Sequence, residues 1–309
     1  MRSIRLLSAL LIAALLITCG VAAAEAEKNI RIVCTSFPCY DFARAVAGAG
    51  DEIRLLIRPG TEVHAYEPTS GDIMAIAECD LFICIGGESD AWADDILESF
   101  GEDAPQVLRL IDCVDPIEEE EQAHMTHAGA HAKGETEYDE HIWTSPANAA
   151  RMVSAVERAM RDISDNEAYA ENAQAYIAAI EQVDARISEI VQNAARREMI
   201  FADRFPFIYF TRQYGLTYYA AFPSCAAESE PSAKTLAFLI DRVKEDHIPA
   251  IYTIEMSNQR TAKTIAEETG VEILTFYSGQ TVTEADFSAG ETYVTLMWKN
   301  ADALEKGLN

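Results

Sequence analysis

Residues 29–60, NIRIVCTSFPCYDFARAVAGAGDEIRLLIRPG, decide the fold. A β-rich apolar run opens this stretch, a helical pattern closed by glycine follows, and a second β-rich run ends it. The alternation continues with a helical pattern at 70–80 and β-rich runs at 81–87 and 106–115. Strands that alternate with helices predict a parallel sheet with helices on both faces. Ligands of such sheets gather at the loops after the strands, and His64 lies in one of those loops.

Residues 164–197 have a different pattern. Ser164 to Glu167 fit a capping box, and apolar residues then recur at steps of three and four without Gly or Pro. At 1.5 Å per residue this predicts one helix of roughly 50 Å. The α/β alternation then restarts, with β-rich runs at 198–202, 216–222, 248–255 and 271–277 and helical patterns at 232–246, 260–270 and 288–308.

The expected architecture is therefore α/β, with two lobes that are each a mainly parallel sheet flanked by helices. We expect an N-terminal lobe at 29–163, a bridging helix at 164–197 and a C-terminal lobe at 198–309. One long rigid helix between lobes allows little pivoting. The binding site is expected in the cleft between the lobes.

The first 28 residues are expected to be an export signal and a short linker. Arg2 and Arg5 precede an apolar run at 6–17 that is too short to span a membrane. The residues before Cys19 resemble the box of a lipid-modified bacterial cysteine, although small residues at 20–24 also offer ordinary cleavage. We expect a lipoprotein anchored through Cys19 to the outer face of the cell membrane, with a periplasmic protein as the alternative.

Composition limits the partners. The chain has 309 residues and a formal net charge of −27, which disfavours nucleic acid and anionic lipid and tolerates cations. Six cysteines remain besides Cys19, and no two of them have C-x-x-C spacing. For these six, buried thiols are favoured over disulfides and over metal ligands. These cysteines are Cys34, Cys39, Cys79, Cys84, Cys113 and Cys225.

The histidines point to a metal. Four of the six lie within 118–143, and an acidic loop at 116–140 holds His124, His127 and His131, which could capture zinc weakly. The alternative for this loop is a charged insertion without a role. His141 stands instead where the loop meets a helix with Ser145 as N-cap and Pro146 at its first position. His64 and His141, both at junctions of one lobe, favour a shared metal ion.

The chain resembles a known family, the metal-binding solute receptors of bacterial ATP-binding-cassette importers for zinc and manganese. The resemblance covers the whole mature chain and is carried by PGTEVHAYEPTSGD at 59–72, the His-rich loop, DEHIWTSPANA at 139–149 and FPFIYFTRQYGL at 205–216. Segments at 227–236 and 251–274 continue it. It implies that His64 and His141 are metal ligands, that zinc or manganese is the transported ligand, and that a membrane permease with its ATPase is the partner.

Two positions depart from the family's ligand pattern. The third family ligand falls on Arg204, which cannot coordinate a metal, and the fourth falls near Tyr277. The C-terminal lobe must then supply other donors or none. We expect Glu228 and Glu255 as ligands, with Arg204 pairing with a spare carboxylate. Weaker alternatives are Glu230 and Asp203, and the carboxylates could instead bind only Arg204 and water.

Two imidazoles with carboxylate oxygens suit Zn2+, and Mn2+ is possible. The expected protein is a monomeric receptor with no enzymatic activity. A zinc-dependent hydrolase is a rival, but no H-E-x-x-H, G-x-S-x-G or P-loop motif supports it. Other rivals are the same scaffold binding an anionic metal chelate or haem through Arg204, and an adhesin without metal dependence.

Overall fold

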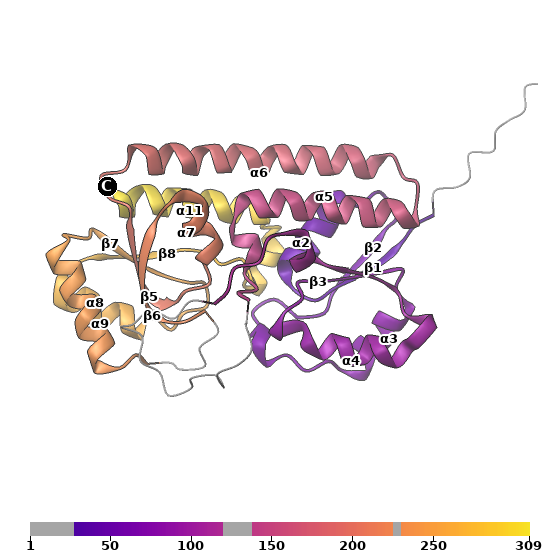
Figure 1. The fold of residues 1–309 in the computed structure, drawn as a ribbon, viewed down its shortest axis with the longest axis horizontal. Helices are drawn as coiled ribbons and strands as arrows, with labels where there is room; N and C mark the ends of the chain where they lie inside the picture. Colours follow the sequence, from indigo (N-terminus) through magenta and orange to yellow (C-terminus); the bar gives the residue numbers. More distant parts are fainter. Residues whose placement is uncertain (1–27, 120–137, 225–229) are drawn as a thin grey trace, which may run out of the picture.

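The computed structural model describes residues 28–119, 138–224 and 230–309. Two four-stranded sheets lie side by side beneath the long helix α6 (Ala168–Asn193) (Figure 1). The strand orders are β2-β1-β3-β4 and β6-β5-β7-β8, and all neighbouring strands are parallel, which confirms the expected α/β fold class. The strands are β1 (Arg31–Cys34), β2 (Glu52–Leu55), β3 (Leu81–Cys84), β4 (Gln106–Arg109), β5 (Glu198–Arg204), β6 (Thr217–Phe222), β7 (Ala250–Thr253) and β8 (Glu272–Thr275).

Helices cover both faces of the first sheet because side chains alternate along each strand. Val33 and Phe82 pack on one face with Ile76 and Leu97 of α3 and α4. The other face joins a larger core that includes Phe42 of α2. The helices of this lobe are α2 (Phe37–Val46), α3 (Ser70–Glu78), α4 (Ala91–Phe100) and α5 (Pro146–Ile163), with 3-10 turns η1 (Val63–Ala65), η2 (Glu88–Asp90), η3 (Gly101–Asp103), η4 (Leu110–Cys113) and η5 (Ile142–Thr144).

The second sheet is enclosed in the same way. Ile200 and Ile251 pack with Leu239 of α8 and Ile265 of α9. Phe201 and the opposite face belong to the larger core. The helices of this lobe are α7 (Ile208–Tyr214), α8 (Ala233–Glu245), α9 (Arg260–Thr269), α10 (Glu284–Ala289) and α11 (Tyr293–Leu308).

The bridging helix is shorter than the sequence pattern suggests. The prediction of an unbroken helix over 164–197 with a capping box was wrong, because α6 begins at Ala168 and ends at Asn193. Ser164 donates its hydroxyl hydrogen bond to the carbonyl of Lys28 instead of capping the helix, and the Asn166 side chain accepts from Ala168 N. Helix α6 has 26 residues, spans about 39 Å and packs against both α5 and α11.

The predicted final helix at 288–308 is in fact two helices. Helix α10 ends at Gly290, whose φ of 80° ends the helix in a left-handed conformation. Helix α11 then begins after Thr292, which forms a capping box with Thr295. The start of α11 is held by the other lobe, because the buried carboxylate of Asp41 accepts from Tyr293 N at 2.8 Å.

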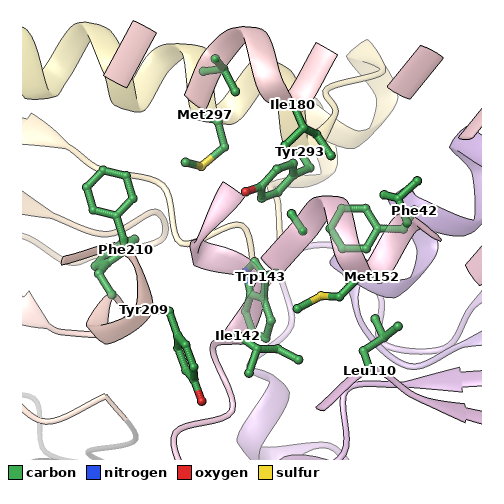
Figure 2. Packing of buried hydrophobic residues seen from close by; sticks show 14 of the residues in the cluster. Phe42, Leu110, Ile142, Trp143, Met152, Ile180, Tyr209, Phe210, Tyr293 and Met297 are labelled. Atoms are coloured by element: carbon green, nitrogen blue, oxygen red, sulfur yellow. The ribbon is translucent and has the colours of Figure 1, made fainter. Parts of the chain in front are cut away.

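One apolar core runs through both lobes. Figure 2 shows Trp143 between residues of α5 and α11, with Tyr209 and Phe210 of α7 nearby. Trp143 is 1% exposed, and its indole N–H donates to the carbonyl of Ser278 at 2.8 Å. Lobes that share a large apolar interface move little relative to each other, as expected for this architecture.

The thiol prediction holds for the cysteines that the structure describes. Cys34, Cys39, Cys79 and Cys84 are buried and free, and Cys113 is free and partly buried. Burial raises the pKa of Cys39 to about 12, so this thiol stays protonated at neutral pH. Cys225 lies outside the described residues.

Replacing Gly307 by alanine should destabilise the fold. A Cβ at this position in α11 would lie 1.9 Å from the hydroxyl oxygen of Tyr252, a residue that is 1% exposed and would have to shift within the core. Such overpacking costs about 1–3 kcal/mol of unfolding free energy. Urea denaturation of Gly307→Ala measures this cost. Asp302→Ala, on the exposed side of the same helix, is the control, and equal stability of the two variants would contradict the prediction.

Candidate metal centre

His64 is oriented by Ser89. The imidazole stands on η1 after β2, and its Nδ1 lies 2.7 Å from Ser89 Oγ. Ser89 in turn donates its hydroxyl proton to the Glu140 carboxylate. Because that proton is used, the Ser89 oxygen accepts from His64, and Nδ1 carries the hydrogen. This tautomer leaves the Nε2 lone pair of His64 for a metal ion.

His141 is oriented in a similar way by Asp139. It precedes η5 and is 1% exposed, and its Nδ1 lies 3.0 Å from Asp139 Oδ1. The carboxylate can only accept, so Nδ1 carries the hydrogen here too. Within the described residues, His141 Nε2 is buried without a hydrogen-bond partner. An unpaired buried nitrogen is costly, and a metal ligand oriented by a carboxylate explains it.

Glu140 completes a group of three, although sequence reasoning did not identify it as a ligand. Ligand atoms of His64, Glu140 and His141 all lie within 4.8 Å of one another, and this is the one such group in the described part of the chain. The Oε2 atom of Glu140 accepts a hydrogen bond from Ser89 N at 3.0 Å. Gly87, with φ 109°, leaves room for it, since a Cβ there would come within 3.0 Å of Glu140 Oε2.

The loop that contains Ser89 is held in place by the buried side chain of Asp90. Asp90 is buried and accepts from the backbone N–H groups of Ile85 and Gly86 at 2.7 and 3.1 Å. Burial raises the pKa of Asp90 to about 6. Tyr209 donates a hydrogen bond to the carbonyl of Asp139 at 2.7 Å and so fixes the segment that leads into His141.

The two imidazoles differ in basicity. Burial lowers the pKa of His64, and the nearby His141 and Arg204 act in the same direction against Glu140. Burial also acts to lower the pKa of His141, but the carboxylates of Asp139 and Glu140 outweigh it and raise that pKa above its ordinary value. As the pH is lowered, a proton therefore competes with a metal first at His141 and only at more acidic pH at His64.

A cavity of about 220 Å³ lies next to His64, lined by residues of both lobes. Gln280 lines the cavity, and its Nε2 lies 3.3 Å from His64 Nε2. Arg204 lines it as well and donates to Glu62 at 3.1 Å. Gly60 N donates to Thr281 Oγ1 at 3.2 Å and closes one side. Polar groups of both lobes therefore lie around His64 Nε2 and the adjoining cavity.

Comparison with known proteins identifies the family. The model of the family described as zinc-uptake complex component A, periplasmic, matches residues 32–307. The chain belongs to this family. It is 31% identical to the zinc-binding lipoprotein AdcA of Streptococcus pneumoniae over 99% of this chain and 61% of AdcA, so it spans about three-fifths of that relative. It is 29% identical to the high-affinity zinc uptake system protein ZnuA of Bacillus subtilis over 94% of this chain and 91% of ZnuA.

Solved structures of the family agree with the fold. The Zn(II)-bound ZnuA-like domain of Streptococcus pneumoniae AdcA matches with a TM-score of 0.74 and 28% identity, covering 91% of this chain and 99% of that domain. The metal-dependent lipoprotein YcdH of Bacillus subtilis matches with a TM-score of 0.77 and 25% identity over 91% of this chain and all of YcdH.

The second-lobe residues expected to be ligands do not join the group of three. Glu255 is 8% exposed, and its carboxylate accepts from Ser278 N, Ser278 Oγ and Gly279 N at 2.7, 2.5 and 2.9 Å. Glu230 is exposed and lies 3.7 Å from Arg260, and Asp203 accepts from Arg204 N. Arg204 pairs with a carboxylate as expected, but that carboxylate is Glu62.

Other expected residues lie outside the described part of the chain. Glu228, the auxiliary histidines His124, His127 and His131, and the lipid attachment residue Cys19 are among them. Tyr277, near the family's fourth ligand position, packs with Phe37, Val282 and Leu296 instead of joining the group.

Proposed function

We propose that this protein is an extracytoplasmic receptor that captures a divalent transition metal, zinc above all, with His64, Glu140 and His141. One observation carries the proposal: ring nitrogens of two histidines and a carboxylate oxygen lie within 4.8 Å of one another, and His141 Nε2 is buried without a hydrogen-bond partner among the described residues. The printed names of the relatives, zinc-binding lipoprotein and zinc uptake protein, support zinc.

The donor set also favours zinc over manganese. Zinc takes four ligands in a tetrahedron and accepts imidazole nitrogen readily, whereas manganese prefers more oxygen ligands. Two imidazoles and one carboxylate supply three of four zinc ligands. The ring tautomers are already set by Ser89 and Asp139, so little ordering is needed when the ion enters.

The receptor performs capture and delivery without bond chemistry. Neutral imidazoles and the Glu140 carboxylate hold the ion, and we propose that the loaded protein passes it to a membrane permease driven by an ATPase. Within the described residues no helix is long and apolar enough to cross a membrane. A lipid on Cys19 as the membrane attachment, and a monomeric state, are part of the proposal.

Calorimetric titration of the metal-stripped protein tests the function. We expect one zinc ion per chain, bound at least about tenfold more tightly than manganese because of the nitrogen donors. Assays of phosphatase, esterase and peptidase activity with zinc present should show no turnover. Zinc binding that survives unchanged in a double variant without His64 and His141 would contradict the proposal.

Zinc affinity should fall in two steps as the pH is lowered. The pKa of His141 is raised, so zinc affinity is highest above this pKa and falls first as His141 takes up a proton. The pKa of His64 is lowered, so His64 takes up its proton, and affinity falls again, at more acidic pH. Competition titrations between about pH 8 and pH 5 cover the range in which histidines titrate. Asp139→Asn should move the first step to lower pH, because it removes the carboxylate that raises the pKa of His141. An unchanged profile would contradict this assignment.

A further inference from the structure

The fourth position of the metal shell has no protein carboxylate, thiolate or imidazole in the described part of the chain. His64, Glu140 and His141 supply three ligands, and no other His, Cys, Asp or Glu of that part joins them. With these three ligands alone, a tetrahedral zinc ion keeps one open position. Gln280 of the C-terminal lobe lies against His64 Nε2.

A cavity between the lobes lies beside His64, because it is lined by the preceding residues Glu62 and Val63 and by Gln280. This space of about 220 Å³ can hold several waters or a small organic acid. Its lining combines the apolar side chains of Val63, Ile254 and Met256 with polar and charged groups, as expected of a ligand site.

Arg204 gives the cavity its chemical preference. It stands at the end of β5, lines the cavity, and is close enough to His64 to be among the charges that shift its titration. Glu62 accepts from Nη1 and is its only ion-pair partner among the described residues. A guanidinium has five N–H donors in a planar fork suited to a carboxylate, so donors remain for a second acceptor.

A bound zinc ion makes an acceptor here more favourable. Zinc and Arg204 would repel each other across the cavity unless an anion lay between them. A carboxylate can bind a metal through one oxygen and a guanidinium through the other. We propose that the receptor takes its metal as a ternary complex, in which a small carboxylate-bearing molecule fills the fourth metal position and is bound by Arg204. This inference rests on the zinc site proposed above.

Native mass spectrometry of the metal-stripped protein tests the proposal with three probes: zinc alone, zinc with citrate, and zinc with histidine. We expect a species with one zinc and one organic molecule in at least one of the mixed samples. The two mixtures distinguish a simple carboxylate from an amino acid as the source. Zinc bound without any organic molecule in both mixtures, at millimolar additive, would overturn the ternary complex and leave the zinc site intact. Failure of zinc alone to bind would instead contradict the zinc site.

Variants of Arg204 make the test specific. Arg204→Gln should weaken binding of the organic molecule to the zinc-loaded protein at least about tenfold, because a charge-assisted hydrogen bond is lost, while zinc alone binds at least as tightly as before, because a charge that repels the ion is removed. Arg204→Lys keeps the charge without the fork and should give a smaller loss. Arg186→Gln, on α6 and paired with Glu189 and Glu305, is the control.

A competing way to complete the shell is the amide oxygen of Gln280. The variant Gln280→Ala distinguishes this alternative from an organic molecule as the fourth ligand. We expect zinc binding without additive to change less than about tenfold, because water replaces the amide next to the ion. A larger loss of zinc affinity in the absence of additive would mean that Gln280 is the fourth ligand and would overturn the proposal.

Discussion

Replacing His141 by alanine should weaken zinc binding by about 100-fold or more. Changes in residues that only orient metal ligands already cost about 10–100-fold, and this change removes a ligand itself. The effect should be large for a second reason: His141 is almost fully buried, and no polar group of the described residues is hydrogen-bonded to its Nε2 atom. Calorimetry with a competing chelator measures the loss.

The control for this variant is another histidine of the same chain. His247 is exposed and has φ 51°, so His247→Asn removes an imidazole while keeping a residue that tolerates the left-handed backbone. We expect His247→Asn to bind zinc like the unchanged protein. Retention of full zinc affinity by His141→Ala, with the fold intact by circular dichroism, would remove His141 from the site.

Replacing Glu140 by glutamine should weaken zinc binding by about 10–100-fold. The amide keeps the shape of the side chain, but it can accept only one of the two hydrogen bonds that Ser89 N and Oγ donate to the carboxylate, and it loses the charge that attracts the ion. Without zinc, this variant should be close to the original protein in stability, because relief of the repulsion between Glu140 and the buried Asp90 offsets the lost hydrogen bond. Loss of zinc affinity without loss of stability therefore distinguishes a ligand from a structural residue.

A neighbouring glutamate provides the comparison. Glu62 precedes η1 and pairs with Arg204, but it is not one of the three clustered residues. Glu62→Gln should reduce zinc affinity less than about threefold, since a partly exposed charge acts through a screened field. Equal losses in Glu62→Gln and Glu140→Gln would show that only overall negative charge matters.

The sequence predicted the fold because each lobe repeats a simple alternation of strand and helix. It also predicted that His64 and His141 approach each other, and their ring centroids lie 6.2 Å apart. The start of α6 at Ala168 was not predictable, since Ser164 is engaged by Lys28, 136 residues away in the chain. The same holds for the start of α11, where Tyr293 N donates to Asp41, 252 residues away in the chain.

Glu140, which we propose as a ligand, was not among the predicted ones. It is adjacent to His141, and adjacent residues usually point in different directions. Here the chain turns at His141, with φ −79° and ψ 43°, and Ser89 from a distant loop holds the Glu140 carboxylate toward His64. Glu255 was expected to reach the metal, but donors of Ser278 and Gly279 surround its carboxylate.

Anomalous diffraction from crystals of the zinc-loaded protein tests the central claim most directly. We predict one zinc ion between the lobes, at about 2.0–2.2 Å from His64 Nε2, His141 Nε2 and a carboxylate oxygen of Glu140. An ion that is bound elsewhere, or that leaves either imidazole uncoordinated, would contradict the proposed capture site.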